Sequence, residues 1–156
     1  MGLLALSVAT AAGDLAPGPA WLGLWMGTAG VSLGLSTILM ARKSRAAGTT
    51  LLTGTGRKFL WNLIPPLFAG VLLTAALARA GVYELLPGVW LLLYGVAVVT
   101  GGSYSVRPVP VMGSAFIALG GAALASPANW GTLYMAAGFG LLHIVFGAVI
   151  WRRHGG

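Results

Sequence analysis

The sequence predicts an all-α protein: a polytopic transmembrane helical bundle with five spans and a short sixth helix at the N-terminus. Its 156 residues are 58% hydrophobic and only 7% charged. A soluble domain carries about 25% charged residues, and a mean hydropathy of +0.91 is typical of membrane-embedded chains. Because each spanning helix takes about 20 residues, little chain remains for a separate soluble domain. We therefore expect residues 1–156 to form a single integral membrane domain.

The composition also excludes several classes of protein. Nine Lys and Arg residues against two acidic residues give a net charge of +7, which by itself could indicate nucleic-acid binding. These basic residues lie where apolar runs end, not as a patch on a soluble face, so no nucleic-acid partner is expected. The chain has no cysteine, almost no carboxylates and no phosphate-binding or nucleophile-elbow motif. We therefore expect no enzyme activity.

Helices are predicted at about residues 1–13, 20–41, 59–80, 86–101, 109–125 and 129–151. Three of them begin with a shared pattern of a proline, a Trp two or three residues later, and a second aromatic residue after four more. The three copies are Pro19–Trp21–Trp25, Pro87–Trp90–Tyr94 and Pro127–Trp130–Tyr134. Proline is tolerated in a first helical turn, and aromatic residues gather at membrane interfaces. These three helices are therefore predicted to run in the same direction, with antiparallel helices between them.

Two of the predicted helices leave alternatives open. The segment 1–13 is too short for a standard span, so it is a short first helix entering from the cytoplasm, a partial segment, or a cleaved signal sequence. In the helix 59–80, Pro65 and Pro66 either interrupt a continuous helix or lie in the first turn of a span that begins near Ile64. The second interpretation is favoured, and it places Asn62 near the N-cap.

The basic residues predict the orientation of the bundle. Eight share one face: Arg42, Lys43, Arg45, Arg57, Lys58, Arg107, Arg152 and Arg153. Arg79, Asp14 and Glu84 fall on the other face. The positive-inside rule then predicts a protein of the bacterial cytoplasmic (inner) membrane with its C-terminus in the cytoplasm. The eight basic residues are expected to contact anionic lipid head groups.

Stripes of small residues predict close helix packing. The first stripe is Gly23, Gly27, Gly30 and Gly34, the second is Ser114, Ala118 and Ala122, and a third includes Gly140. Small residues let helix backbones approach within a membrane. The stripes either pack the protein's own bundle, which is the favoured interpretation, or mediate formation of a homo-oligomer or docking to a larger membrane complex.

Few polar residues lie inside the predicted spans. The candidates for a polar pathway or a ligand site are His143, Asn62, Tyr94 and Thr100. A single histidine without further ligands is a poor metal site, so no metal or cofactor is predicted. The leading hypothesis is a non-catalytic accessory or interaction component. The alternatives are a small transporter or channel for an uncharged or apolar solute, and a subunit that holds a haem or chlorophyll-type cofactor on His143.

Overall fold

The computed structural model describes residues 1–13, 15–46 and 54–154, which contain helices and no strand. The first five helices are α1 Gly2–Ala11, α2 Pro19–Ala46, α3 Gly54–Arg79, α4 Leu86–Gly102 and α5 Pro108–Ala125. The last span is built from α6 Gly131–Met135, the π-helix η3 Ala136–Leu142 and α7 His143–His154. Short 3-10 turns precede α4 and α6, at η1 Tyr83–Leu85 and η2 Ala128–Trp130.

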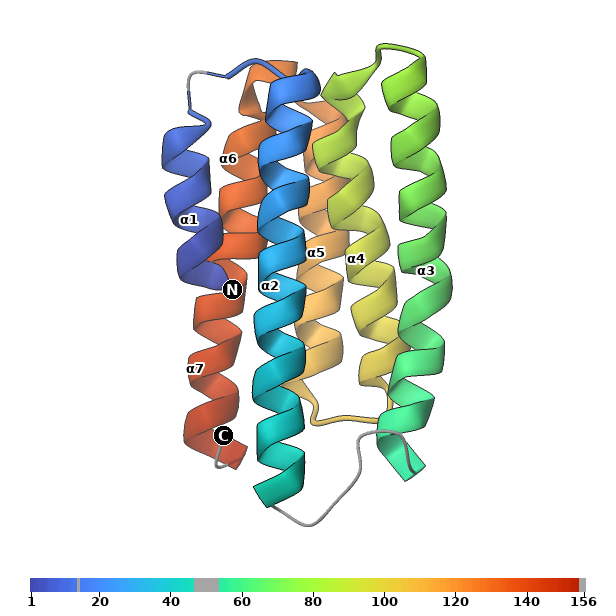
Figure 1. Cartoon of the computed structure of the whole chain (residues 1–156), viewed down its shortest axis with the longest axis vertical. Coiled ribbons are helices and arrows are strands. Elements are labelled where there is room, and N and C mark those ends of the chain that lie inside the picture. Colours follow the sequence, from blue (N-terminus) through green and yellow to red (C-terminus); the bar gives the residue numbers. More distant parts are fainter. Residues whose placement is uncertain (14, 47–53, 155–156) are drawn as a thin grey trace.

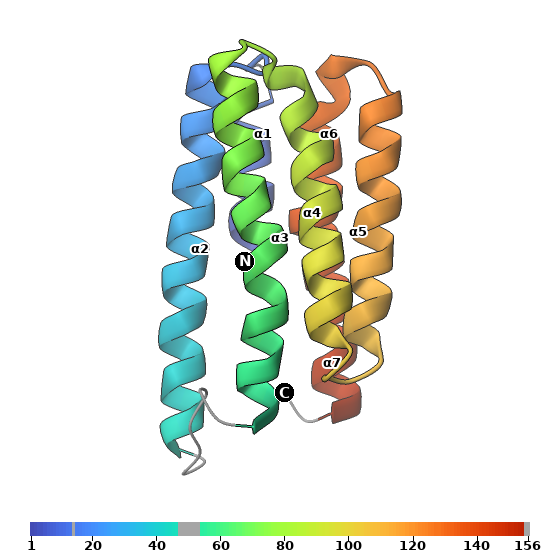
Figure 2. The same cartoon turned by 90° about the vertical axis from the view of Figure 1, so that its right-hand side faces the viewer.

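The helices form an up-and-down bundle in which successive spans are antiparallel (Figures 1 and 2). Five helical stretches of the described chain are long and apolar enough to cross a membrane, and the protein is a multi-span helical membrane protein. The end of α2, the start of α3, the α4–α5 turn and the end of α7 share one end of the bundle, here called the basic end. The opposite end, here called the far end, carries the α3–α4 turn and the turn before α6.

The N-terminal helix covers only part of the bundle's height. α1 has ten residues, which is about 15 Å at 1.5 Å per residue and half of a 30 Å hydrocarbon core. It begins midway along the bundle and rises to the far end (Figure 1). Its first residue, Gly2, lies against Gly140 and Ile144 of the last span. As described, α1 is therefore a half-length helix rather than a sixth full span.

Two of the three shared helix-start patterns place their aromatic residues in contacts within the bundle, whereas Trp130 of the third is 49% exposed. Trp21 and Trp25 of α2 are 0% and 3% exposed, and Trp21 stacks on Trp90 of α4 at 5.6 Å between ring centroids. The indole N–H of Trp21 donates to the Thr132 hydroxyl at 3.0 Å, and that of Trp90 donates to the Thr74 hydroxyl at 2.7 Å. These contacts join α2, α3, α4 and α6 near the far end.

The favoured interpretation of Pro65 and Pro66 is wrong, because α3 is one continuous helix that carries both prolines in its interior. Pro66 cannot donate a hydrogen bond to the carbonyl four residues earlier, on Asn62. The Thr100 hydroxyl of α4 lies within hydrogen-bond distance of that carbonyl, at 3.1 Å, and also of the Val96 and Ala97 carbonyls of its own helix, at 2.9 and 3.2 Å. Asn62 is not an N-cap, since its side-chain amide donates to the Lys58 carbonyl at 2.8 Å. A neighbouring helix thus offers the carbonyl freed by the proline a donor that is shared with its own backbone.

The last span departs from a regular α-helix in its middle. Residues Ala136–Leu142 form a π-helix, which follows α6 without a break and leads directly into α7. Two glycines in this segment are tightly packed, because a Cβ on Gly138 would lie 2.4 Å from Leu91, and one on Gly140 would lie 2.6 Å from Leu6. The wider turn changes the rotation of α7 relative to α6, and it therefore determines which way His143 faces.

Candidate functional site

The glycine stripe of α2 faces away from the bundle. Gly23, Gly27, Gly30 and Gly34 are all exposed, and a Cβ added at any of them would meet no described atom within 4 Å. At 100° per residue, Gly23 lies about 200° around the helix from the buried Trp21. The bundle therefore packs on the tryptophan side of α2 and leaves the α2 glycine face, defined by these four residues, uncovered. This differs from the interpretation that the stripe packs internally.

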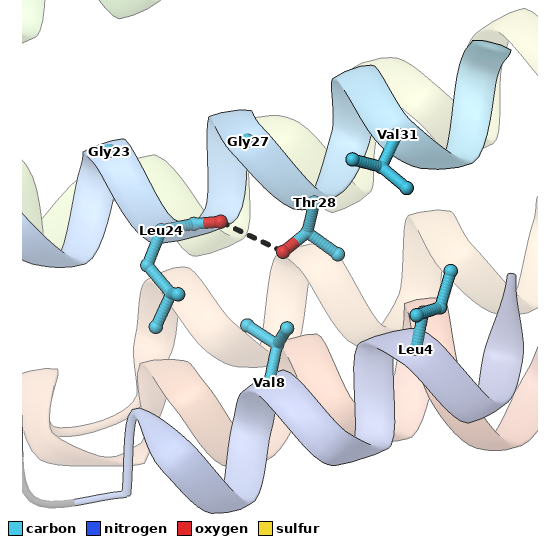
Figure 3. A pocket seen from close by; sticks show the side chains of 7 residues that line it. All are labelled: Leu4, Val8, Gly23, Leu24, Gly27, Thr28 and Val31. Carbon is cyan, nitrogen blue, oxygen red and sulfur yellow. Dashed lines mark hydrogen bonds between the residues drawn. The ribbon is translucent and has the colours of Figure 1, made fainter.

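Gly23 and Gly27 of the α2 glycine face border a shallow groove between α1 and α2 (Figure 3). The groove measures about 290 Å³, and its lining is Leu4, Val8, Gly23, Leu24, Gly27, Thr28 and Val31. Its one hydroxyl, on Thr28, donates to the Leu24 carbonyl of its own helix at 2.8 Å. The groove thus offers an apolar, sterically open surface with no polar group that needs a partner.

Glycines also pack inside the bundle, and those between α4 and α5 were not among the predicted stripes. α4 carries Gly88 and Gly95 seven residues apart, and α5 carries Gly113 and Gly120 at the same spacing. A Cβ on Gly95 would lie 2.7 Å from the Gly113 carbonyl oxygen, and one on Gly120 would lie 2.9 Å from that of Gly88. The sequence signal that could have identified these packed glycines is their seven-residue spacing, which repeats on both of these antiparallel neighbours.

The other two predicted stripes have different environments. Ser114, Ala118 and Ala122 are exposed on the outer side of α5. The Ser114 hydroxyl donates to the Pro110 carbonyl of its own helix at 3.2 Å. Gly140, in contrast, is buried against Leu6 of α1. The stripe of α5 is therefore a second exposed small-residue surface, whereas Gly140 belongs to the interior.

His143 lies inside the bundle, where it meets Tyr94, another candidate for a ligand or pathway residue. Its Nε2 lies 2.9 Å from the Tyr94 hydroxyl. The imidazole packs beside the rings of Phe116 and Phe139, at 5.4 and 6.1 Å between centroids. Its buried Nδ1 has no hydrogen-bond partner among the described residues. A haem or chlorophyll-type group could reach Nε2 only if Tyr94 moved away. No group of three potential metal ligands occurs in the described part of the chain.

The four candidate pathway residues form two separate pairs. Tyr94 meets His143, whereas Thr100 meets the backbone of Asn62. Tyr94 and Thr100 are six residues apart on α4, which corresponds to a rotation of about 240°. One pair therefore faces the last span and the other faces α3. The structure does not bring the four residues together.

The predicted basic residues gather at the basic end, where the described side chains are exposed. These side chains belong to Arg42, Arg45, Arg57, Lys58, Arg107, Arg152 and Arg153. The side chain of Lys43 and all of Asp14 lie outside the described part of the structure. Arg79 ends α3 at the far end, and Glu84 follows in η1. The basic end is thus strongly cationic.

Comparisons of the chain with protein-family models, with curated proteins and with solved structures find no match. The arguments for function therefore rest on the chain's own residues.

Proposed function

We propose that this membrane protein is a non-catalytic interaction component that binds a second transmembrane helix through the α2 glycine face. The observation that carries the proposal is the orientation of the stripe. All four glycines point away from the bundle, and no described atom lies within 4 Å of a Cβ built on any of them. Lipid chains gain little from a flat glycine surface, whereas a helix can approach it closely and gain van der Waals contact.

The shape of the surface supports a helix as the partner. Spacings of four, three and four residues keep the glycines on one side of α2 over about three turns. The adjoining groove with α1 is apolar along the same stretch. Partner side chains could enter the groove while the partner backbone lies on the glycines. We therefore propose a partner helix that is apolar and presents small residues at the same spacing.

We also propose an orientation for the component, with the basic end in the cytoplasm of a bacterium and the far end across the inner membrane. The exposed Arg and Lys residues at the basic end support this assignment through the positive-inside rule. Labelling of a cysteine introduced at Ser103 or at Gly81 by a membrane-impermeant reagent in intact cells tests it. Reaction at position 103 and protection at position 81 would contradict the proposed orientation.

Gly27→Leu tests the interaction. The added side chain projects from an open surface, so we expect the thermal unfolding of the purified protein to change little. The same side chain holds a partner helix away, so the size of the native assembly, measured by native mass spectrometry from mild detergent, is expected to fall.

Gly147→Leu is the matched control, because a Cβ there also meets no described atom but lies on α7. This control is expected to leave the assembly unchanged. If Gly27→Leu retained the wild-type assembly, or if the wild-type protein were monomeric and without a co-purifying partner, the proposal would be wrong.

A further inference from the structure

A cationic corner lies at the basic end, where the start of α3 packs on the end of α4 and Lys58 lies over Tyr104 of the α4–α5 turn. It consists of Arg57 and Lys58 of α3 with Tyr104 and Arg107 of the turn, and is here called the α3 corner. All four side chains are exposed. The only acidic residue in the described part of the chain, Glu84, lies in η1 at the opposite end of the bundle. Within residues 1–13, 15–46 and 54–154, the three positive charges of the corner therefore have no carboxylate near them.

Contacts between α3 and α4 hold the corner in place. A Cβ on Gly101 would lie 3.2 Å from the Phe59 ring, so the start of α3 presses closely on the end of α4. One turn further along, the Thr100 hydroxyl bonds the Asn62 carbonyl. The Lys58 ammonium then lies 5.8 Å from the centroid of the Tyr104 ring, within the range of a cation–π contact. The start of α3 is therefore held against the end of α4 and the turn that follows it.

An exposed apolar stripe continues from the corner along α3. Its members are Trp61, Ile64, Phe68 and Val71, which follow Arg57 at spacings of four, three, four and three residues. Trp61 and Phe68 are 67% and 61% exposed. From Arg57 to Val71 the helix rises about 21 Å. That is about half of the 40–45 Å thickness of a bilayer with its head groups, so the stripe matches the length of one lipid in one leaflet.

We propose that the α3 corner binds the head group of an anionic phospholipid, whose acyl chains lie along the stripe of α3. The charge of the corner is complementary to a phosphodiester, and basic pockets beside transmembrane helices are typical sites for such lipids. Trp61 lies one turn from Arg57 and Lys58, at the depth where its amphipathic ring suits the interface. This site does not involve α2, so it is independent of the proposed function.

The test separates a discrete site from the general attraction of a cationic end. The full-length protein is reconstituted in nanodiscs of phosphatidylcholine with one-fifth phosphatidylglycerol and then analysed by native mass spectrometry. The corner variant is Arg57→Gln/Lys58→Gln/Arg107→Gln. The matched control, Arg45→Gln/Arg152→Gln/Arg153→Gln, removes the same charge from the same end of the bundle.

We expect the wild type and the control to retain one phosphatidylglycerol molecule, and the corner variant to retain at least tenfold less. Equal losses in the two variants would mean that the attraction is diffuse, and equal retention would mean that the corner does not bind lipid. Either result would overturn the proposal. Thermal unfolding in a neutral detergent checks folding. If the triple corner variant did not fold, Arg107→Gln compared with Arg153→Gln would provide the same discrimination.

Discussion

The α4–α5 pair and α2 use the same residue in opposite ways. In α4 and α5, glycines face glycines across the contact, and an added Cβ would lie 2.6–3.1 Å from the opposing backbone. In α2, four glycines at similar spacing face outward and meet no described atom. Half of the α4 span is buried in the bundle, compared with 11% of the α2 span. The same small-residue signal thus produces a closed interface in one place and an open surface in another.

The difference follows from how the helices are connected and from which residues occupy the other side of each helix. A short turn links α4 to α5, so the two helices are antiparallel neighbours at little cost in chain entropy. In α2, the bulky Trp21 and Trp25 already occupy the side that faces the bundle. Small residues therefore identify a face that can approach another helix closely, whereas the rest of the chain decides whether that helix belongs to the same molecule.

The largest expected effect comes from adding one methyl group to the closed α4–α5 contact, compared with the same addition to the open α2 glycine face. Gly95→Ala would place a Cβ 2.7 Å from the Gly113 carbonyl oxygen and 2.8 Å from the Ile117 nitrogen, so the two backbones must separate. We expect a loss of about 2–3 kcal/mol in the free energy of unfolding, measured by denaturant titration in mixed micelles. Gly30→Ala makes the same change on the open α2 glycine face and is expected to shift the free energy of unfolding by less than about 0.5 kcal/mol. Equal effects would mean that the two glycine sets do not differ.

The number and type of spans could be predicted from the sequence, because apolar runs and the charges at their ends can be located directly along the chain. Which face of each helix is buried could not be predicted in the same way. The aromatic residues at the helix starts were assigned to the membrane interface, yet Trp21 stacks on Trp90 inside the bundle. In an apolar chain, both the lipid-facing and the buried sides are hydrophobic, so periodicity carries little information about direction.

A second expected effect concerns the polar contact on the closed side of the bundle. Tyr94→Phe removes the hydroxyl that meets His143 and keeps the ring that packs 4.8 Å from Phe116. The imidazole would then lose its one side-chain hydrogen-bond partner among the described residues, so we expect a loss of about 1.5 kcal/mol, near the upper end for such bonds in membranes. Tyr104→Phe, at the exposed basic end, is expected to cost almost nothing in the same unfolding measurement. A cost below about 0.3 kcal/mol for Tyr94→Phe would show that packing alone holds this region.

The candidate polar residues show where sequence reasoning fails for a site. Tyr94 and His143 are 49 positions apart, and nothing in their local sequence indicates that they meet. Their contact follows the π-helix Ala136–Leu142, which contains the tightly packed Gly138 and Gly140. Pro66 is a contrasting case, since the carbonyl that it leaves without a partner was predictable. The donor, Thr100 on the next helix, could be identified only from the structure.

That donor provides the smallest of the expected effects. Thr100→Val keeps the shape of the side chain but removes the 3.1 Å contact with the Asn62 carbonyl, in addition to the hydroxyl's bonds to Val96 and Ala97 of its own helix. Thr37→Val on α2 removes only a hydrogen bond to the Leu33 carbonyl of its own helix, and that carbonyl belongs to a regular helical turn. We expect a loss of about 0.6 kcal/mol for Thr100→Val, the average for interhelical bonds in a membrane, and almost none for Thr37→Val. If the two threonines cost the same, the helix would tolerate Pro66 without help from α4. In that case, Thr100→Val should also leave the retention of phosphatidylglycerol unchanged, because the contact between Thr100 and Asn62 is one of those that hold the α3 corner.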